Sequence, residues 1–197
     1  MKIARKVISL LLVLAMAAGL TGCGRKNFSH KTLVKAAKKL DLEESSDNEE
    51  FYEHFGMKNH WKEAYITVKD EDAQNIYDVY VNRWKDLPGY DVPEATAIAI
   101  YNDDGLYMVS LLTFESETRA KKFYKKYADT YFPEGDDGEE NGYTYTIYSF
   151  DDGKDRFRMN GVYLKGNTVL TMRGTTSDQD IVETICKEFK IISPLEY

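Results

Sequence analysis

The sequence predicts an α+β fold, in which helices pack against a mostly antiparallel β-sheet. Two observations support this prediction. Several segments place apolar residues three and four positions apart, as a helix with one buried face does, and several others alternate apolar and polar residues with the period of a strand. Short turns rich in glycine, asparagine and aspartate separate most of the strand-like segments, and such turns join antiparallel neighbours.

Two helices are expected at the start of the folded part. The first covers residues 30–40, follows Ser29 as its N-cap, and has an apolar stripe made by Leu33, Ala36, Ala37 and Leu40. A second, shorter helix begins at Ser46-Asp47-Asn48-Glu49, which matches the capping box, and ends at Gly56. Both helices precede the predicted strands.

The middle of the chain predicts one strand, one helix and a hairpin. The strand covers residues 64–68, where apolar and polar side chains alternate. The helix covers residues 70–84, and Leu87-Pro88-Gly89 stops it. The two strands of the hairpin flank a turn at Asn102-Asp103-Asp104-Gly105 and cover residues 95–101 and 106–114.

The last third predicts a helix, an acidic loop, three strands and a final helix. Ser116 caps the first of these helices, which extends to about Tyr131, and residues 133–142 form the loop. The three strands are joined by short polar turns and cover residues 143–150, 156–165 and 168–173. The final helix covers residues 178–190, and Pro194 prevents the tail from continuing far as a helix.

From residue 64 onward, the order of strand, helix, strand, strand, helix and strand resembles a ferredoxin-like βαββαβ sandwich, extended by a C-terminal hairpin and helix. That resemblance implies helices on one face of a mostly antiparallel sheet, with the two N-terminal helices covering an edge or the remaining face. The alternative is a curved antiparallel sheet packed on the N-terminal helices, because the C-terminal strands can also follow one another as a meander.

The first 23 residues carry the most specific functional signal. Lys2, Arg5 and Lys6 give a basic start, Val7 to Leu20 is almost entirely apolar, and Leu20-Thr21-Gly22-Cys23 follows. Together, the charge, the apolar length, the small residues and the cysteine resemble the signal peptide and lipobox of bacterial lipoproteins. The resemblance implies that residues 1–22 are removed and that Cys23 receives a diacylglyceryl group. The protein would then be anchored to the cell membrane, facing outside the cytoplasm.

Two acyl chains hold a protein stably on a bilayer, so this anchor would need no membrane-spanning helix. The alternative is that Val7 to Leu20 remains as an uncleaved anchor, but these 14 residues fall short of the about 20 needed to cross a hydrocarbon core. We therefore expect a signal peptide over residues 1–22, a lipidated tether over residues 23–28 and a single globular domain over residues 29–197.

The expected mature chain is strongly acidic. The signal segment carries three positive charges, so its removal changes the formal net charge from −7 to −10. An acidic surface repels phosphate backbones, which excludes nucleic acid as the expected partner. It also disfavours broad contact with anionic lipids beyond the tether.

One cluster has side chains suited to a metal site. Glu50, Glu53 and His54 would share one helix face at positions 0, 3 and 4, and His60 lies beyond the end of that helix. A solvated helix end is the simpler interpretation. The carboxylates between Glu134 and Glu140 do not follow the spacing of a calcium loop, so a solvated loop is expected there. No metal or cofactor is expected.

Cysteine and tyrosine give weaker signals. Cys186 lies on the apolar stripe of the last predicted helix, so a buried, unreactive thiol is expected. Tyr143 and Tyr145 fall on one face of their strand and Tyr148 on the other, so these rings are expected to be neither all in the core nor all on the surface. Exposed tyrosine can stack on sugar rings or contact a protein partner, whereas ordinary cross-strand packing is the simpler interpretation.

Motifs that would name a reaction are missing from the expected mature sequence. It contains no glycine-rich phosphate loop, no Gly-x-Ser-x-Gly, no His-Glu-x-x-His and no Cys-x-x-Cys. We therefore expect a non-enzymatic module, without catalytic residues, that binds an envelope protein or glycan. The alternative is an envelope hydrolase with a carboxylate or metal-dependent site, motivated by the cluster from Glu50 to His60. A solute receptor is disfavoured because one domain does not suggest two lobes that close on a ligand.

Overall fold

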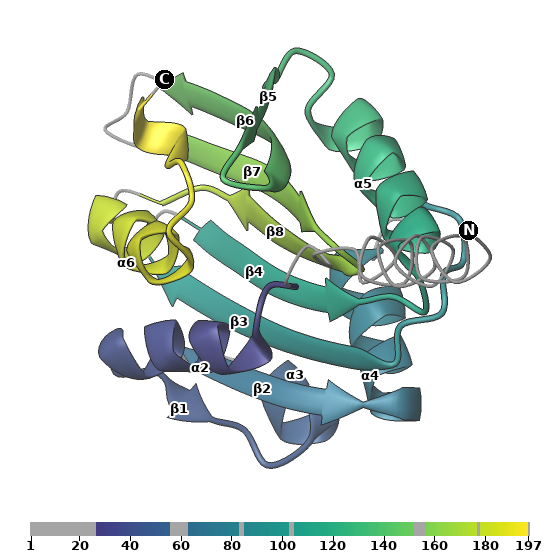
Figure 1. The fold of residues 1–197 in the computed structure, drawn as a ribbon. Coiled ribbons are helices and arrows are strands. Elements are labelled where there is room, and N and C mark those ends of the chain that lie inside the picture. The colour runs from purple at the N-terminus through teal and green to yellow at the C-terminus, as the bar shows by residue number, and fades with distance from the viewer. Residues whose placement is uncertain are drawn as a thin grey trace, which may run out of the picture.

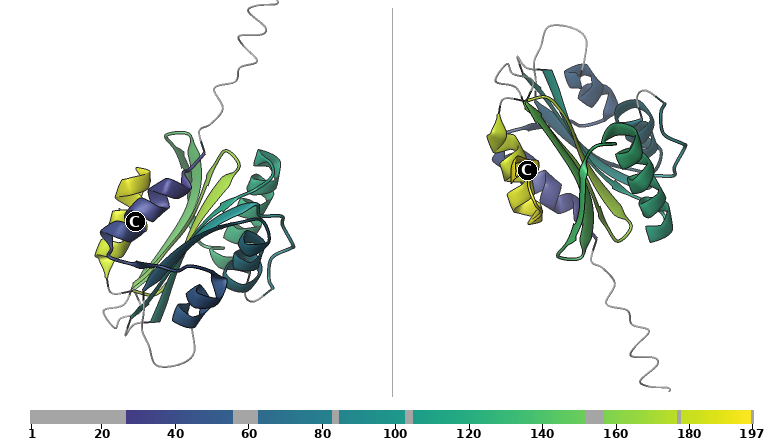
Figure 2. Two further views of the ribbon diagram at one scale, coloured as in Figure 1. Left: turned by 90° about the horizontal axis from the view of Figure 1, so that it is seen from below. Right: turned by 90° about the horizontal axis from the view of Figure 1, so that it is seen from above.

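Eight strands form one sheet in the computed structural model, and helices cover both of its faces (Figures 1 and 2). The structure describes residues 27–55, 63–82, 85–102, 105–151, 157–176 and 178–196. Within these ranges the strands are β1 (Glu43–Glu44), β2 (Ala64–Lys69), β3 (Glu94–Asn102), β4 (Gly105–Thr113), β5 (Asp136–Glu140), β6 (Tyr143–Asp151), β7 (Phe157–Lys165) and β8 (Thr168–Gly174). They lie in the order β1-β2-β3-β4-β8-β7-β6-β5.

The sheet consists of two antiparallel meanders that meet at its centre. Strands that follow each other in sequence are neighbours from β2 to β4 and from β5 to β8. The meanders join where β4 pairs antiparallel with β8, and there the side-chain oxygens of Ser110 and Thr171 lie 2.6 Å apart. The short edge strand β1 pairs in parallel with β2.

The described helices divide between the two faces of the sheet (Figure 2). On one face lie α2 (His30–Lys39), α6 (Gln179–Phe189) and the 3₁₀ turn η2 (Pro194–Glu196). On the other lie α3 (Asn48–Phe55), α4 (Asp70–Asn75), the π-helix η1 (Ile76–Val81) and α5 (Glu117–Tyr131). Each face therefore encloses its own buried core.

Successive side chains of the central strands point to opposite faces of the sheet, so they belong alternately to the two cores. In β3, Ile98 faces the core under α2 and α6. Three short side chains of the same strand face the other core: Ala95, Ala97 and Ala99. Their small size leaves room for large rings from the helices, and the rings of Phe51 and Tyr80 pack there with centroids 5.6 Å apart. The Tyr80 hydroxyl also donates a hydrogen bond to the backbone oxygen of Ile98.

The α+β prediction is confirmed, but the ferredoxin-like strand order is wrong. In the ferredoxin-like order, the helix after the first strand crosses the sheet, and the strand that follows this helix is not a neighbour of the first strand. Here the chain leaves the end of β2, forms α4 and η1, and returns to that same end, where the Asp70 N–H donates to the Pro93 oxygen at 2.9 Å. β3 therefore begins opposite Lys69 and runs antiparallel beside β2.

The two N-terminal helices were expected to cover an edge or a face of the sheet as a pair, but they do not lie together. α2 and α3 lie on opposite faces, and β1 between them lies at the sheet edge (Figure 1). This unpredicted strand is held by backbone and side-chain bonds: the Ser45 N–H donates to the Tyr65 oxygen at 2.9 Å, and the Tyr65 hydroxyl donates to Glu44 at 2.7 Å.

The predicted helix over residues 70–84 is shorter and changes its winding. It begins as α4 and continues as η1, and the Asn82 N–H donates to the Tyr77 oxygen at 2.7 Å, a bond that spans five residues. The Asn82 side chain then bonds both the N–H and the oxygen of Leu87, at 2.9 and 3.0 Å. The helix therefore ends at Val81, before the predicted Leu87-Pro88-Gly89 breaker, and the Asn82 side chain fixes the loop that follows.

The capping box of α3 is shifted by one residue from the prediction. Asp47 accepts a hydrogen bond from the Glu50 N–H at 2.9 Å, and Glu50 accepts one from the Ser46 N–H at 2.6 Å. Asp47 thus occupies the N-cap position that the sequence pattern assigned to Ser46. The predicted end at Gly56 lies outside the described residues.

The remaining helices follow their predicted spans within one or two residues, which is the usual uncertainty of a helix end. Ser116 caps α5 by accepting from the Arg119 N–H at 3.3 Å, and Asp178 caps α6 by accepting from the Asp180 N–H at 3.0 Å. Ser29 occupies the N-cap of α2, but its side chain makes no capping bond.

Candidate functional site

A groove of about 1030 Å³ lies between α5 and the β5–β6 hairpin. Four residues of α5 form its basic wall: Lys121, Lys122, Lys125 and Lys126. Asp137 and Glu139 of β5 line the other side. The floor contains Tyr124, Thr144, Thr146 and Leu164. We call this feature the α5–β5 groove.

The sequence of α5 explains why its lysines reach the groove. Ala120, Phe123 and Tyr127 are buried against the sheet, with the Phe123 and Tyr127 ring centroids 5.4 Å apart. Helical geometry then directs the residues between them away from the core, and all four lysines of the basic wall are exposed. Lysine pairs at 121–122 and 125–126 repeat after four residues and therefore share a helix surface. The basic wall was not predicted from the sequence, although this spacing of the lysines indicates it.

β5 occupies part of the region where an acidic loop was predicted. It consists of four exposed acidic residues around Gly138, so no apolar alternation marks it as a strand. It forms because β6 offers a full set of partners, from Asp136 opposite Ile147 to Glu140 opposite Tyr143. Gly138 is needed because a Cβ at this position would lie 2.3 Å from Cζ of Tyr145.

A chain of side-chain hydrogen bonds ties the two sides of the groove together. Thr146 donates to Asp137 at 2.5 Å, so its single hydroxyl proton is used, and the Tyr124 hydroxyl donates to the Thr146 oxygen at 2.8 Å. Burial raises the pKa of Tyr124 to about 12, and the nearby Asp137 carboxylate adds to the rise. Tyr124 is therefore a neutral donor at physiological pH, and the chain fixes the groove floor.

The groove is a basic exception on an acidic protein. None of the four lysines forms an ion pair with any residue that the structure describes. Asp137, by contrast, accepts a hydrogen bond from the Thr146 hydroxyl. The groove lining thus carries four lysines against the three carboxylates of Asp129, Asp137 and Glu139, a formal charge of +1, whereas the whole chain has a formal net charge of −7.

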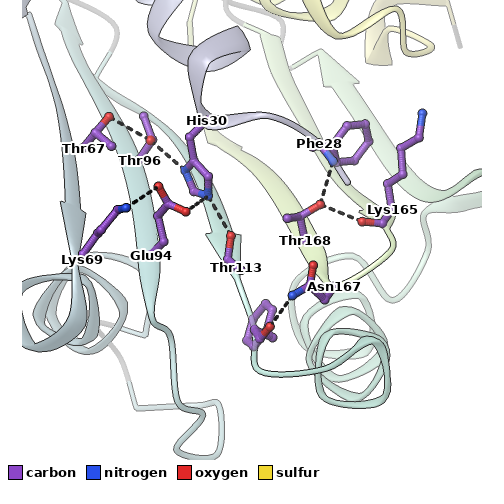
Figure 3. Close-up of polar contacts among 11 residues, drawn as sticks. Phe28, His30, Thr67, Lys69, Glu94, Thr96, Thr113, Lys165, Asn167 and Thr168 are labelled. Carbon is purple, nitrogen blue, oxygen red and sulfur yellow. Dashed lines mark hydrogen bonds and ion pairs between the residues drawn. The ribbon is translucent and has the colours of Figure 1, made fainter. Parts of the chain in front are cut away.

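A second feature, which we call the N-terminal clamp, fixes the chain at Asn27 and Phe28, and Figure 3 shows the contact of Phe28 with Thr168. The Phe28 N–H donates to the Thr168 hydroxyl at 2.9 Å, and the side-chain oxygen of Asn27 accepts from the Asn167 N–H at 3.1 Å. The Phe28 ring is buried, with its centroid 5.4 Å from that of Phe189. The described chain is therefore attached to the sheet from its first residue.

His30 extends the N-terminal clamp to the strands of the first meander (Figure 3). Its Nδ1 lies 2.9 Å from the Thr96 hydroxyl, and its Nε2 lies 2.8 Å from the Thr113 hydroxyl. Burial lowers the pKa of His30, while Glu94, 3.8 Å away, acts in the opposite direction. The neutral imidazole therefore serves as a structural bridge between α2, β3 and β4.

A smaller cavity of about 610 Å³ lies beside α6 and η2 and includes Cys186. Burial raises the pKa of the Cys186 thiol to about 12, so it is protonated at physiological pH. The predicted buried thiol is confirmed, because the side chain is 3 % exposed. The tail beyond α6 is fixed here by Tyr163, which donates to the Ile192 oxygen at 3.0 Å.

The predicted metal cluster is not assembled by the described residues. Glu50 is used in the capping box of α3, and the side chains of Glu53, His54 and His60 lie outside what the structure describes. In the described part of the chain, no group of three or more histidine, cysteine, aspartate or glutamate residues is placed to hold a metal ion.

The prediction that Tyr143 and Tyr145 lie on the opposite face from Tyr148 is confirmed, but the expectation that the three rings cannot all belong to a core is wrong, because helices cover both faces of the sheet. Tyr143 and Tyr145 are buried on one face, whereas Tyr148 packs against the core of the other face. The buried pair has ring centroids 6.0 Å apart, so these rings pack in the core and do not form a binding surface.

The lipobox and Cys23 lie outside the described residues, so the predictions on residues 1–26 stand as predictions. Among the described helices, none is both long and apolar enough to cross a bilayer.

Comparisons with known proteins add little to this geometry. No family model matches the chain, and no curated protein matches it. Among solved structures, the chain is similar to the extracellular domain of PknH from Mycobacterium tuberculosis, with a TM-score of 0.43 and 10% identity. The match covers 84% of this chain and 96% of that chain.

Proposed function

We propose that this chain is a lipid-anchored lipoprotein outside the cytoplasm, whose domain binds an envelope component through the α5–β5 groove without catalysing a reaction. The observation that carries the binding role is the groove itself. It has an open volume of about 1030 Å³, four lysines without described ion-pair partners, and a floor fixed by the Tyr124–Thr146–Asp137 chain. These side chains are suited to recognising and orienting a ligand through charge and hydrogen bonds.

The N-terminal clamp supports the anchored arrangement. Asn27 follows Cys23 by four positions, and four residue steps of extended chain span at most about 14 Å. Because the clamp fixes Asn27 and Phe28 beside the β7–β8 turn, a lipid on Cys23 would hold that end of the sheet close to the bilayer. The groove includes Leu164, next to the same turn, so its ligand would be met near the membrane surface.

The alternative of an envelope hydrolase rested on the cluster from Glu50 to His60. The structure engages Glu50 in a helix cap and describes no side chain of the other three members. No observation favours this alternative over a binding role.

Expression of the full chain in a bacterium that processes lipoproteins tests the anchor. We expect mass spectrometry of the membrane fraction to show a mature chain that starts at diacylglyceryl-modified Cys23. Cys23→Ser is expected to remain unprocessed, while Cys186→Ser, the matched control, is expected to be processed and anchored normally. Unmodified Cys23 in the wild-type mature chain would contradict the anchor.

A photo-crosslinking residue tests the groove. Placed at Lys125 in the groove, it is expected to cross-link the anchored protein to an envelope component, whereas the same residue at Lys38, exposed on the opposite face, is expected to give no such product. Equal cross-linking at both positions, or turnover of an envelope substrate, would overturn the proposed binding role.

A further inference from the structure

We infer that the occupant of the α5–β5 groove is an anionic glycan chain, which carries carboxylate or phosphate groups on its sugar rings. The inference rests on the proposed binding role and names the ligand class for that groove. Three features of the groove support it: the charge of its lining, the chemistry of its floor and its open shape.

Charge complementarity selects an anion. The basic wall places four exposed ammonium groups along one helix surface, and none has an ion-pair partner among the described residues. These four lysines outnumber the carboxylates of the lining, Asp129, Asp137 and Glu139, and Asp137 is held in place by a hydrogen bond from Thr146. A chain with anionic groups at intervals gains contacts with the lysine pairs, which are one helical turn apart.

The floor selects sugar rings over a simple polyanion. It combines apolar surface from Tyr90, Tyr124 and Leu164 with the hydroxyl of half-buried Thr144. Sugar rings present an apolar face and a rim of hydroxyls, so they match both kinds of surface at once. A polyanion without rings would contact the lysines only.

The open shape favours a chain over a small molecule. The groove is bounded on two sides by α5 and by the β5–β6 hairpin, and its lining extends from Thr118 near the start of α5 to Asp129 near the end. An enclosed small-molecule pocket surrounds most of its ligand, whereas an open groove contacts a polymer along one side.

Binding of defined probes to the full chain in neutral detergent micelles tests the inference. The probes are an oligogalacturonate, an uncharged malto-oligosaccharide of equal length, and an oligoglutamate peptide of equal charge. We expect the oligogalacturonate to bind at least about 10-fold more tightly than either other probe. Raising the salt from about 50 to about 500 mM is expected to weaken its binding severalfold, because exposed charges are screened.

Substitutions place the binding in the groove. Reversing two charges in Lys121→Glu/Lys125→Glu is expected to weaken oligogalacturonate binding by about 10-fold or more. The matched control, Lys31→Glu/Lys38→Glu, reverses two exposed lysines of α2 on the opposite face and is expected to change binding less than twofold. Thr144→Val, which keeps the branched shape but removes the hydroxyl, is expected to weaken binding about threefold.

The outcomes separate this inference from the binding role on which it rests. Tighter binding of oligoglutamate than of oligogalacturonate would overturn the glycan inference and indicate an acidic peptide in the same groove. Equal loss of binding in both lysine double variants would show a diffuse charge effect and overturn the site. A specific cross-link from Lys125 to an envelope component, together with no affinity for oligogalacturonate, would preserve the proposed function and reject the anionic glycan.

Discussion

At the scale of single residues, the buried polar side chains of this protein are structural supports. His30, Tyr124 and Cys186 each have a pKa displaced mainly by burial, and each is held neutral at physiological pH. His30 and Tyr124 bridge elements through threonine hydroxyls. The sequence indicated the burial of Cys186 from its place on an apolar stripe, but it did not indicate the partners of His30, which come from strands more than sixty residues away.

His30 is expected to make the protein less stable in mild acid. Its folded-state pKa lies below the ordinary value of 6.5, so the unfolded chain binds the proton more readily. The stability that neutral His30 contributes is therefore present above about pH 6.5, and it is lost as the pH falls through the folded-state pKa. Urea unfolding at neutral and at mildly acidic pH measures this loss. His30→Gln, which keeps a polar side chain but does not titrate, is expected to show a smaller loss, and an equal loss would contradict the assignment.

Cys186 is expected to be chemically silent in the folded protein. With a pKa of about 12, its thiol is almost entirely protonated at neutral pH, and 3 % exposure blocks reagents. In a Cys23→Ser variant, Cys186 is the remaining cysteine, so a disulfide reagent reports on it alone. Labelling is expected to be at least about 100-fold slower than in concentrated guanidinium chloride. Rapid native labelling would show that the cavity beside α6 opens to solvent.

At the scale of elements, the sequence predicted the helices and hairpins whose own residues show the apolar spacing or the turn composition typical of such an element. The apolar spacing of α2, α5 and α6 predicted their spans, and the Asn102 to Gly105 composition predicted the β3–β4 hairpin. β5 could not be predicted in this way, because Asp-Asp-Gly-Glu-Glu has no apolar or β-branched residue and becomes a strand through pairing with β6. The acidic wall of the groove depends on that pairing, and so does the shape of the site.

Gly138 is expected to control whether β5 forms. In Gly138→Ala the new Cβ would lie 2.3 Å from Tyr145 Cζ, so either the ring or the strand must move. We expect a loss of about 1–3 kcal/mol in unfolding free energy, as for other overpacked sites. Gly89→Ala is the matched control because nothing lies within 4 Å of its Cβ position. Hydrogen exchange is expected to rise selectively in β5, and unchanged protection there would refute this role for Gly138.

The N-cap of α3 gives a direct comparison between the predicted and the observed residue. Asp47 accepts from the Glu50 N–H, so Asp47→Ala is expected to cost about 1 kcal/mol of stability. Ser46→Ala removes a side chain that bonds only the neighbouring Asp47, at 3.3 Å, and is expected to cost less than about 0.3 kcal/mol. Urea unfolding of both variants decides between the two positions. A larger cost at Ser46 would restore the capping box that the sequence pattern indicated.

At the scale of the whole molecule, one sheet separates two cores that share the same strands. Leu111 and Leu112 are neighbours in β4, yet Leu111 faces the core under α2 and α6, and Leu112 faces the core under α5. Strand order could not be read from local patterns, because each predicted strand fits several neighbours equally well. The antiparallel return through α4 and η1 is decided by tertiary contacts such as the bond from Asp70 to Pro93.

Because the strands are shared, the two cores are expected to unfold together. Phe123→Leu loosens the core under α5, and Ile185→Val loosens the core under α6; each is expected to lower stability by about 1 kcal/mol. Each loss is expected to move the whole urea transition without changing its slope, since losing one core exposes the other face of the same strands. Far-ultraviolet and tyrosine circular dichroism, followed together, are expected to give coincident transitions for both variants. A variant that separates the two signals would show that the helices on one face unfold independently of the sheet.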